Sequence, residues 1–325
     1  MGIASKIKKE LSDKGNHNEA WEMVYYRCKY AAASLLGKIW SEEHYAQWFY
    51  HLFTGKHLDL QSPKYFDEKI WWLKLHNRDP LLTKCSDKYA VRKYVKECGY
   101  EDILIPQYAV LDSVKQLDFD KYHEEIVVKC THNSGGHVFY DPRKPLTKKQ
   151  EKTAKKRLKF ILKHNASVLS HEWNYKNIPP RIIVEKVIRN ANGELPLDYK
   201  FMCFDGEPKL LFLDLGLINA DSSYNHDYPR NIYDMDFNLL PVHETRPNAD
   251  YPVKKPENFE KMIEIARTLS KPFPHCRVDL YNIDGKVYFG EITFYHGGGC
   301  NKIEPEEWDL RMGSWIHLPT EECTK

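Results

Sequence analysis

The sequence predicts an α+β fold preceded by a helical N-terminal region, and two observations support this. Residues 1–80 carry apolar side chains at helical spacing, many of them aromatic. From about residue 103 the pattern changes to short apolar runs separated by turn residues, which is typical of strands that alternate with short helices. At 325 residues the chain has room for two or three substructures, each with its own core.

Two helices beyond this region are marked by end signals. Asp87 is placed as the cap of a helix that Gly99 ends, with apolar residues at helical spacing between them. A second helix follows Thr147, which is expected to form a capping box with Gln150. We interpret its lysine-rich face as solvated, and the alternative is a docking surface for an anionic polymer or an anionic membrane.

The predicted strands are short runs rich in β-branched and aromatic residues. They cover residues 126–130, 181–188, 198–204 and 209–215, and two more lie near the C-terminus. Asp205 and Gly206 begin a hairpin turn between the third and the fourth of these strands.

The two C-terminal strands carry charged residues among apolar ones. If the loop between them is the three residues 283–285, with its glycine in the left-handed conformation, Arg277 lies opposite Glu291. The period of two then places Arg277, Asp279, Glu291 and Thr293 on one face. Two nearby carboxylates suit Mg²⁺, which takes few protein ligands. The alternative is a hairpin whose wet face carries a simple Arg–Glu pair.

A second set of residues suits the phosphates of a nucleotide. Lys129 lies near the end of a predicted strand that runs into the loop His132, Asn133, Ser134, Gly135 and Gly136. Backbone N–H groups of such a loop can approach a phosphate, and Lys129 supplies positive charge. Lys88 and Lys200 could add charge, although a solvent-facing position is the ordinary interpretation of each. The backbone of Glu185, Lys186, Val187 and Ile188 could pair with a planar base, as that of almost any buried strand could.

Composition and charge argue against several classes of protein. The net charge of +2 is not that of a nucleic-acid-binding protein. Eight cysteines without a C-x-x-C motif indicate neither a zinc site nor a disulfide framework. No window approaches the roughly 18 uninterrupted apolar residues of a bilayer span, and the N-terminus lacks the apolar region of a secretory signal. We therefore expect a cytoplasmic protein, with peripheral contact at the inner face of the cytoplasmic membrane as an open possibility.

The order of these segments resembles that of the ATP-grasp superfamily. More closely, five motifs look like those of the TupA-like ATP-grasp family, whose members are found in gene neighbourhoods for bacterial cell-wall, capsule and surface-polysaccharide synthesis. The motifs are Asp87-Lys-Tyr-Ala-Val-Arg92, Lys129-Cys-Thr-His132, Asp198-Tyr-Lys-Phe201, Arg277-Val-Asp-Leu-Tyr281 and Gly290-Glu-Ile-Thr-Phe-Tyr295. The resemblance runs from about residue 58 to about residue 299.

This resemblance implies an ATP-grasp fold, in which two α+β lobes clasp ATP. After the helical, aromatic-rich region of residues 1–80, residues 81–183 would form the lobe with the phosphate-binding loop, and residues 184–325 the lobe with the metal and catalytic residues. Lys88, Lys129 and Lys200 would contact the phosphates. The loop from His132 to Gly136 would fold over them, and the segment from Glu185 to Ile188 would read adenine.

The resemblance also implies the reacting groups. Asp279, Glu291 and Thr293 would hold Mg²⁺, while Arg277 and Lys200 would be catalytic, with Arg277 facing the charge that develops during attack. Thr293 stands where the family usually has Asn. Residues 296–300 differ from the turn that is typical of the family.

The activity implied by the resemblance is that of an ATP-dependent carboxylate–amine ligase. A carboxylate attacks ATP to give an acyl phosphate and ADP, and an amine or amino acid then displaces phosphate to form an amide. The carboxylate would belong to a uronic acid of a capsular or cell-wall polysaccharide. The alternatives are a sugar kinase, a glycosyltransferase that uses Asp234-Met-Asp236, and a carbohydrate-binding module built on the tryptophans and tyrosines.

Overall fold

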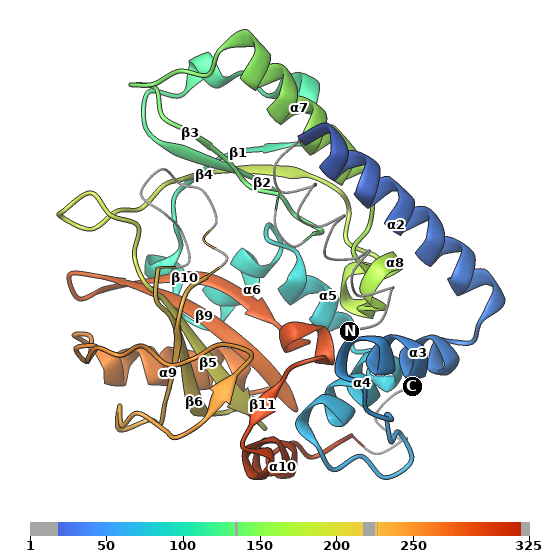
Figure 1. Cartoon of the computed structure of the whole chain (residues 1–325). Helices are drawn as coiled ribbons and strands as arrows, with labels where there is room; N and C mark the ends of the chain where they lie inside the picture. The colour runs from blue at the N-terminus through green and yellow to red at the C-terminus, as the bar shows by residue number, and fades with distance from the viewer. Residues whose placement is uncertain (1–18, 134–135, 217–224, 226, 320–325) are drawn as a thin grey trace.

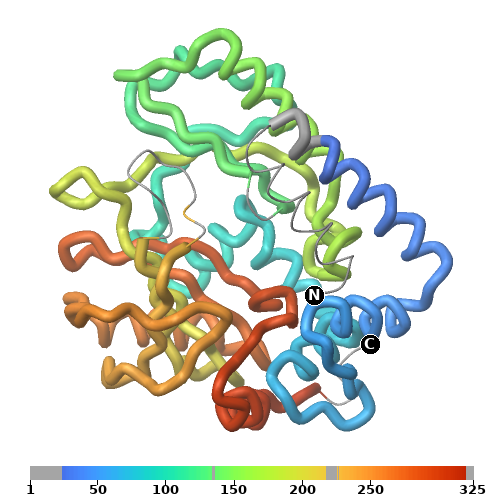
Figure 2. Tube along the Cα trace, viewed as in Figure 1, coloured from blue at the N-terminus to red at the C-terminus, as the bar shows by residue number. Residues whose placement is uncertain are grey.

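The computed structural model describes residues 19–133, 136–216, 225 and 227–319. These residues form two large antiparallel sheets, one above the other in Figure 1, with helices along one side. The chain crosses between the two sheets at residues 104–106 and again at residues 187–197, as Figure 2 shows. Of the helices that the structure describes, none combines the length and the apolarity that crossing a membrane requires.

The helical N-terminal region predicted over residues 1–80 is confirmed for its described part, and residues 1–18 lie outside the described residues. It contains α2 (Glu19–Ile39), α3 (Glu42–Thr54) and α4 (Phe66–His76), and α5 (Pro80–Ser86) and α6 (Val91–Glu97) follow. Side chains of α4, α5 and α6, such as Phe66, Leu82 and Val95, belong to the same apolar core as the larger sheet. α3 packs on α4 through Ala46, Tyr50 and Trp71. The N-terminal helices from α4 onward therefore support the larger sheet.

The helix predicted from Asp87 begins only at Val91. The carboxylate of Asp87 accepts a hydrogen bond from the Tyr89 N–H at 2.9 Å, and its carbonyl accepts one from the Val91 N–H at 2.9 Å. Asp87 therefore closes a turn that holds Lys88, in place of capping a helix. Gly99, with a φ of +89°, follows the end of α6 as expected.

The smaller sheet consists of β1 (Gln107–Leu111), β2 (Ile126–Cys130), β3 (Val138–Tyr140) and β4 (Ile182–Lys186), in the order β1-β4-β2-β3. α7 (Lys148–Leu162) covers one face, and its Leu158 is buried against the strands. The capping box of Thr147 and Gln150 is present at its start. The lobe boundary expected between residues 183 and 184 falls inside β4, which pairs with β1 and β2 of this sheet.

The larger sheet has the order β10-β9-β5-β6-β7. Its strands are β5 (Asp198–Phe204), β6 (Glu207–Asp214), β7 (Arg230–Tyr233), β9 (His275–Ile283) and β10 (Lys286–Thr293). α9 (Phe259–Ser270) covers one face: Phe201 of β5 packs against Phe259, and Cys203 contacts the Ala266 carbonyl. Since side chains alternate along a strand, Asp198 and Lys200 point to the other face, toward the smaller sheet.

Short elements complete the fold. They are the 3₁₀ turns η1 (Glu101–Ile103), η2 (Val114–Gln116), η3 (Phe119–Lys121), η4 (Trp173–Tyr175) and η5 (His296–Gly299), the helices α8 (Ser167–Ser170) and α10 (Glu306–Ser314), and a ribbon of β8 (His243–Glu244) with β11 (Ile303–Glu304). α4 holds η5 in place, because Trp71 Nε1 donates to the Gly299 carbonyl and Lys74 Nζ to the Gly298 carbonyl, each at 2.9 Å.

The turn of the C-terminal hairpin is one residue shorter than predicted. Ile283 pairs with Lys286, so only Asp284 and Gly285 lie in the loop, with φ angles of +50° and +81°. Two residues with positive φ form the turn whose twist suits a hairpin, and Asp tolerates that conformation. The predicted opposition of Arg277 and Glu291 is therefore wrong.

A β-bulge at Gly290 nevertheless brings the predicted side chains to one face. Beyond the bulge, Glu291 pairs with Asp279 and Thr293 with Arg277. A shift of one residue in the pairing register moves the side chains of a strand to the opposite face. The short turn and the bulge each shift the register by one residue, so together they leave the side chains on the predicted face. A Cβ on Gly290 would lie 2.9 Å from the carbonyl oxygen of Asp279.

Replacing Gly290 should therefore damage the hairpin. We expect Gly290→Ala to lower the free energy of unfolding by about 1–3 kcal/mol, because the added methyl group meets backbone that cannot move away easily. The same change at Gly37, an exposed helical position with open space around it, should not lower stability. Urea denaturation of both variants checks this, and equal stabilities would contradict the role of the bulge.

Candidate active site

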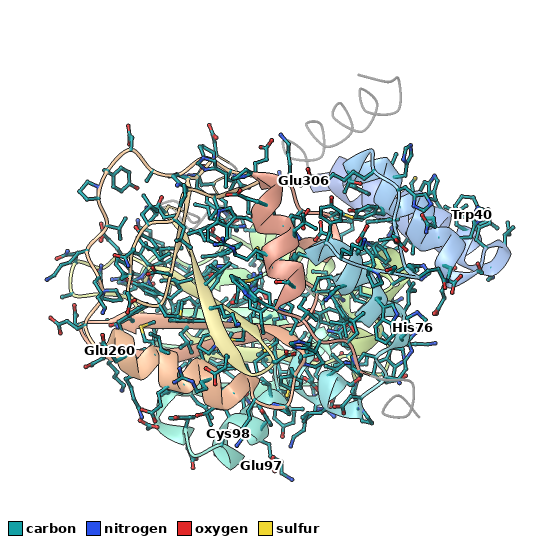
Figure 3. The ribbon with its side chains drawn as sticks, turned by 90° about the horizontal axis from the view of Figure 1, so that it is seen from below. Trp40, His76, Glu97, Cys98, Glu260 and Glu306 are labelled. Carbon is teal, nitrogen blue, oxygen red and sulfur yellow. The ribbon has the colours of Figure 1, made fainter. Side chains whose placement is uncertain are left out.

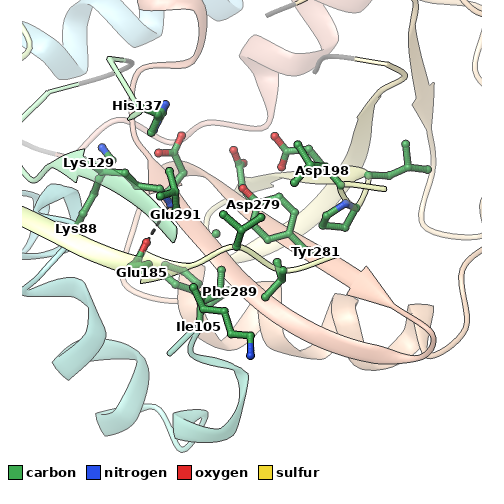
Figure 4. A pocket seen from close by; sticks show the side chains of 18 of the residues that line it. Lys88, Ile105, Lys129, His137, Glu185, Asp198, Asp279, Tyr281, Phe289 and Glu291 are labelled. Carbon is green, nitrogen blue, oxygen red and sulfur yellow. Dashed lines mark hydrogen bonds and ion pairs between the residues drawn. The ribbon is translucent and has the colours of Figure 1, made fainter. Parts of the chain in front are cut away.

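A cavity of about 450 Å³ lies between the two sheets. One part of its lining is apolar: Ile105, Val127, Phe139, Val187, Ile188, Leu195, Leu197 and Phe289. The other part carries charges: Lys88, Arg92, Lys129, Glu185, Asp198, Asp214, Asp279 and Glu291. Figure 4 shows Lys88, Lys129 and His137 on one side of Glu291 and Asp198 on the other, with Asp279 between. A flat apolar group and an anion could occupy such a cavity together.

Glu185 holds two cations at the edge of the cavity. Lys129 of β2 donates from Nζ to Glu185 Oε2 at 3.0 Å, and the dashed line in Figure 4 marks this pair. Arg92 of α6 donates from Nη1 to Glu185 Oε1 at 3.4 Å. The Glu185 side chain is only 9% exposed, so the two cations compensate a buried carboxylate.

Lys88 reaches the cavity from the turn before α6. Its Nζ donates to the Asn133 carbonyl at 2.8 Å, and its backbone N–H donates to the Thr131 carbonyl at 3.3 Å. Burial lowers the pKa of Lys88, and the negative charge of Glu291 opposes this fall. The structure thus brings Lys88, Lys129 and Glu291 to one end of the cavity.

The predicted phosphate loop lies partly away from the cavity. Asn133 is buried and donates from Nδ2 to the carbonyls of Ile161 and His164, at 3.2 and 2.7 Å, near the end of α7. His132 is also buried, and neither residue lines the cavity. Gly136 has a φ of +74° and lies beside Ile161, whereas Ser134 and Gly135 fall outside the described residues. His137, which follows the loop, does line the cavity.

Arg277 organises the carboxylates of the hairpin. Its Nε and Nη2 donate to the two oxygens of Asp279 at 2.7 and 2.6 Å, and Nη2 also donates to Glu291 at 3.2 Å. The Thr293 hydroxyl donates to Glu291 and accepts from Arg277, each at 3.1 Å. Asp279 and Glu291 line the cavity, whereas Arg277 and Thr293 lie behind them.

The two carboxylates differ in their affinity for a proton. Burial raises the pKa of Asp279 to about 7, although Arg277 and Lys200 oppose the rise. Burial acts in the same direction on Glu291, but Lys88, Arg277 and Lys200 outweigh it and hold its pKa at about 2. A cation beside Asp279 would relieve its buried charge.

The row of charges continues across the larger sheet. Lys200 of β5 contacts Asp198 and, at 3.3 Å, Asp214 of β6. Arg230 of β7 donates from Nε and Nη2 to Asp214 at 2.5 and 3.0 Å, and it also contacts Glu244 of β8. Lys200 is thus occupied by carboxylates, and it is not part of the cavity lining.

Sequence reasoning missed Asp214, Arg230 and Glu244. Asp214 is the next-to-last residue of the strand predicted over residues 209–215, and a carboxylate near the end of an apolar run was the available signal. β7 has four residues and β8 has two, and both are too short to show a periodic pattern. The positions of Arg230 and Glu244 in the sheets could therefore not be predicted from the sequence.

The predicted metal ligands provide oxygen donors that suit Mg²⁺. Asp279 and Glu291 are paired across the strands and face the cavity, and the desolvated charge of Asp279 favours a nearby cation. Among the described residues, no group of three or more His, Cys, Asp or Glu side chains is arranged to hold a metal ion. Substrate oxygens and water would have to complete the coordination.

Comparison with known proteins gives one family and several distant structures. A family model described as TupA-like ATPgrasp matches residues 68–317. A D-alanine–D-alanine ligase from Bacillus anthracis is 18% identical, with 66% of this chain and 59% of that chain covered and a TM-score of 0.36. The D-alanine–D-alanine ligase from Helicobacter pylori is 14% identical, with 79% and 68% covered and a TM-score of 0.41.

An L-amino acid ligase from Bacillus licheniformis is 15% identical, with 66% of this chain and 44% of that chain covered and a TM-score of 0.40. The chain thus spans less than two thirds of the Bacillus anthracis and Bacillus licheniformis enzymes. No curated protein matches the sequence significantly.

The ion pairs of Arg230 with Asp214 and Glu244 should make the free energy of unfolding depend on pH. Burial alone would raise the pKa of Asp214, but Arg230 and Lys200 hold it at about 2. Glu244 is likewise held at about 2 against burial, by His296 and Arg230. Since both pKa values are depressed, the stabilisation is present above about pH 4 and is lost as pH falls toward about 2.

Arg230→Met leaves two buried carboxylates without their main partner and should cost about 3–5 kcal/mol at neutral pH. The difference from the unmodified protein should shrink as the pH falls and the carboxylates take up protons. Arg267→Met, which breaks an exposed pair with Glu207, should cost less than about 1 kcal/mol. Denaturant titrations at neutral and acidic pH measure both, and a loss that is independent of pH would contradict this account.

Proposed function

The chain belongs to the TupA-like ATP-grasp family, and from this we propose that it is an ATP-dependent carboxylate–amine ligase that forms an amide through an acyl phosphate. One observation carries the proposal. A single cavity between two α+β lobes combines an apolar slot, two lysines and a pair of carboxylates held by an arginine. These are the groups that phosphoryl transfer needs, because it depends on positioning and charge compensation and not on a protein nucleophile.

ATP would lie with its base in the apolar part of the cavity and its phosphates at Lys88 and Lys129. The backbone N–H groups of Lys186 and Val187 already donate to the Pro106 and Glu125 carbonyls, each at 3.0 Å. Adenine would therefore be read by the carbonyl groups of this segment and by the Ile188 N–H. The side chains of Val127 and Phe289 would pack beside the ring.

Asp279 and Glu291 would hold Mg²⁺, which neutralises phosphate charge and polarises the γ-phosphate when bound. Thr293 would support Glu291 by its hydrogen bond, in place of serving as a third ligand. Arg277 would be a positioning residue, because its guanidinium fixes both carboxylates. Lys200 would act in a similar way through Asp198 and Asp214.

The reaction would run in two steps. A carboxylate oxygen of the acceptor attacks the γ-phosphorus, the bond to the bridging oxygen of ADP breaks, and an acyl phosphate forms. An amine then attacks the acyl carbon, loses a proton, and phosphate leaves with the bonding electrons. Exclusion of water protects the acyl phosphate, which is why the enclosed position between the lobes matters.

The acceptor would be a uronic acid of a capsular or cell-wall polysaccharide, and the co-substrate an amine or amino acid. The gene neighbourhoods of the family support this choice of substrate. The cysteines without a disulfide framework support action in the cytoplasm, and contact at the inner face of the membrane is part of the proposal. A glycosyltransferase has less support from Asp234 and Asp236. The Asp234 carboxylate accepts hydrogen bonds from the N–H groups of Asp236 and Asn238 at 3.0 and 2.8 Å, so it stabilises a turn, and neither aspartate lines the cavity.

Trapping with hydroxylamine tests the reaction. The full chain is incubated with ATP, Mg²⁺, hydroxylamine and a panel of uronic acids. A ligase gives a hydroxamate and ADP in equal amounts, and Glu291→Gln should abolish both products. A phosphorylated sugar without hydroxamate would identify a kinase and overturn the ligase proposal.

The contribution of Lys129 to nucleotide binding can be measured separately. Lys129→Met should weaken ATP binding by roughly 10- to 150-fold, or about 1.5–3 kcal/mol, because a charge-assisted contact to phosphate is lost. Lys84→Met makes the same chemical change at an exposed pair with Glu97 and should leave the dissociation constant unchanged. Isothermal titration calorimetry compares the variants, and equal affinities would place the phosphates elsewhere.

A further inference from the structure

An apolar stripe runs along the outer face of α2. Val24, Cys28, Ala31, Leu35 and Ile39 follow one another at intervals of three or four residues, so they share one side of the helix, and all are exposed. Leu35 and Ile39 are 59% and 68% exposed. Seven of the thirteen large apolar side chains exposed among the described residues lie within residues 24–53. Burial against the other residues that the structure describes does not explain this stripe.

The opposite face of α2 attaches the helix to the body of the protein. Tyr30 contacts the rings of Phe160 and His164, at centroid distances of 6.3 and 4.7 Å, and Ala33 is buried. Tyr30 and Ala33 lie about half a turn away from Leu35 on the helix. α2 therefore has one face for its own protein and a second apolar face toward solvent.

The corner between α2 and α3 extends the stripe with tryptophans. Trp40 and Trp48 lie 5.5 Å apart between ring centroids, and Trp48 is exposed. Trp40 lies at the outer edge of the molecule in Figure 3. Tryptophan favours the boundary between water and lipid, since its ring is apolar and its N–H is polar.

The charges around the stripe are positive. Residues 24–39 contain Arg27, Lys29 and Lys38 and no acidic residue. In the sequence, Glu19 and Glu22 precede this segment within α2, and Glu42 and Glu43 follow it beyond the corner. Figure 1 shows α7 and α2 following one another along one edge of the molecule. α7 has a row of exposed lysines at intervals that place them on one side of the helix, and the exposed Lys163 follows directly after it. The lysines of the helix are Lys148, Lys149, Lys152, Lys156 and Lys159.

We propose that α2, the corner at Trp40 and Trp48, and the lysine row of α7 form a docking surface for an anionic lipid bilayer. Binding at a membrane surface has two contributions. An apolar stripe inserts between the headgroups and the acyl chains, and lysines attract the anionic headgroups. A second copy of the chain fits less well, because residues 24–39 would bring three cations and no carboxylate to the contact, and Glu19 and Glu22 lie only at the start of α2. A soluble anionic polymer would use the lysines and leave the apolar stripe exposed.

This inference names the surface for the membrane contact in the proposed function and uses none of the residues of the ligase chemistry. The test is cosedimentation of the full chain with vesicles of phosphatidylcholine containing roughly one-third phosphatidylglycerol. Binding should occur at low salt, weaken as salt rises, and be far weaker with phosphatidylcholine alone.

Variants separate the two contributions. Leu35→Glu with Ile39→Glu should reduce partitioning at least about tenfold, since the stripe loses its apolar character. Lys152→Gln with Lys159→Gln should reduce it on the order of 25-fold, at about fivefold for each lysine. The matched control is Leu239→Glu with Leu310→Glu, two exposed leucines outside this surface, which should bind as before.

Several outcomes would overturn the proposal. One is unchanged vesicle binding by both the α2 and the α7 variants. Another is equal binding to a soluble anionic polysaccharide that the α2 change does not weaken, which would mark a polymer site. A third is self-association that the α2 change abolishes, without vesicle binding. ATP affinity measured on the same variants should not change, so failure of this surface is distinguishable from failure of the nucleotide site.

Discussion

Charge compensation across the cavity-facing side of the larger sheet is the constraint on which the rest of the structure depends. Five carboxylates and three cations lie in a row from β10 to β8, and each cation contacts two of the carboxylates. The row consists of Glu291, Asp279, Arg277, Lys200, Asp198, Asp214, Arg230 and Glu244. Most of these side chains are buried, so the loss of any cation leaves a desolvated carboxylate behind. A slip of β5 or β9 by one residue would send the two charged side chains that it contributes to the row into the apolar core under α9. The register of the sheet is therefore tied to its chemistry.

The charged residues around the cavity come from different parts of the fold. The smaller sheet supplies Lys129 and Glu185, the turn before α6 supplies Lys88, and the larger sheet supplies the carboxylates. Neither sheet alone supplies both the lysines and the paired carboxylates that line the cavity. The cavity is lined from both sheets, and α4, α5 and α6 share the core of the larger sheet before the chain continues into the smaller one.

The strands with strong local patterns were predictable, and pairings distant in the sequence were not. β2 and β5 have the predicted bounds, because each is a short run dominated by apolar residues. Arg277 and Glu291 were predicted to share a face, although the predicted turn was one residue too long. The shorter turn alone would have placed them on opposite faces, and the bulge at Gly290 returns them to the same face. The ion pairs of Arg230 with Asp214 and Glu244 depend on β7 and β8, which are too short to show the alternating pattern of a strand. The direction of Asn133, toward α7 and not toward the cavity, depends on carbonyls at the end of a helix about 30 residues later.

The pair of Lys129 and Glu185 has a consequence for how the cavity exchanges its occupant. Glu185 acts as an internal anion that neutralises Lys129 while the cavity holds no phosphate, and Arg92 can retain Glu185 if the lysine turns away. In the proposed ligase, an incoming phosphate would therefore compete with a tethered carboxylate, and its affinity would be the difference between two contacts. When product left, the lysine would regain Glu185 as a partner. A tethered competitor of this kind would weaken binding and ease release, which would favour turnover over retention.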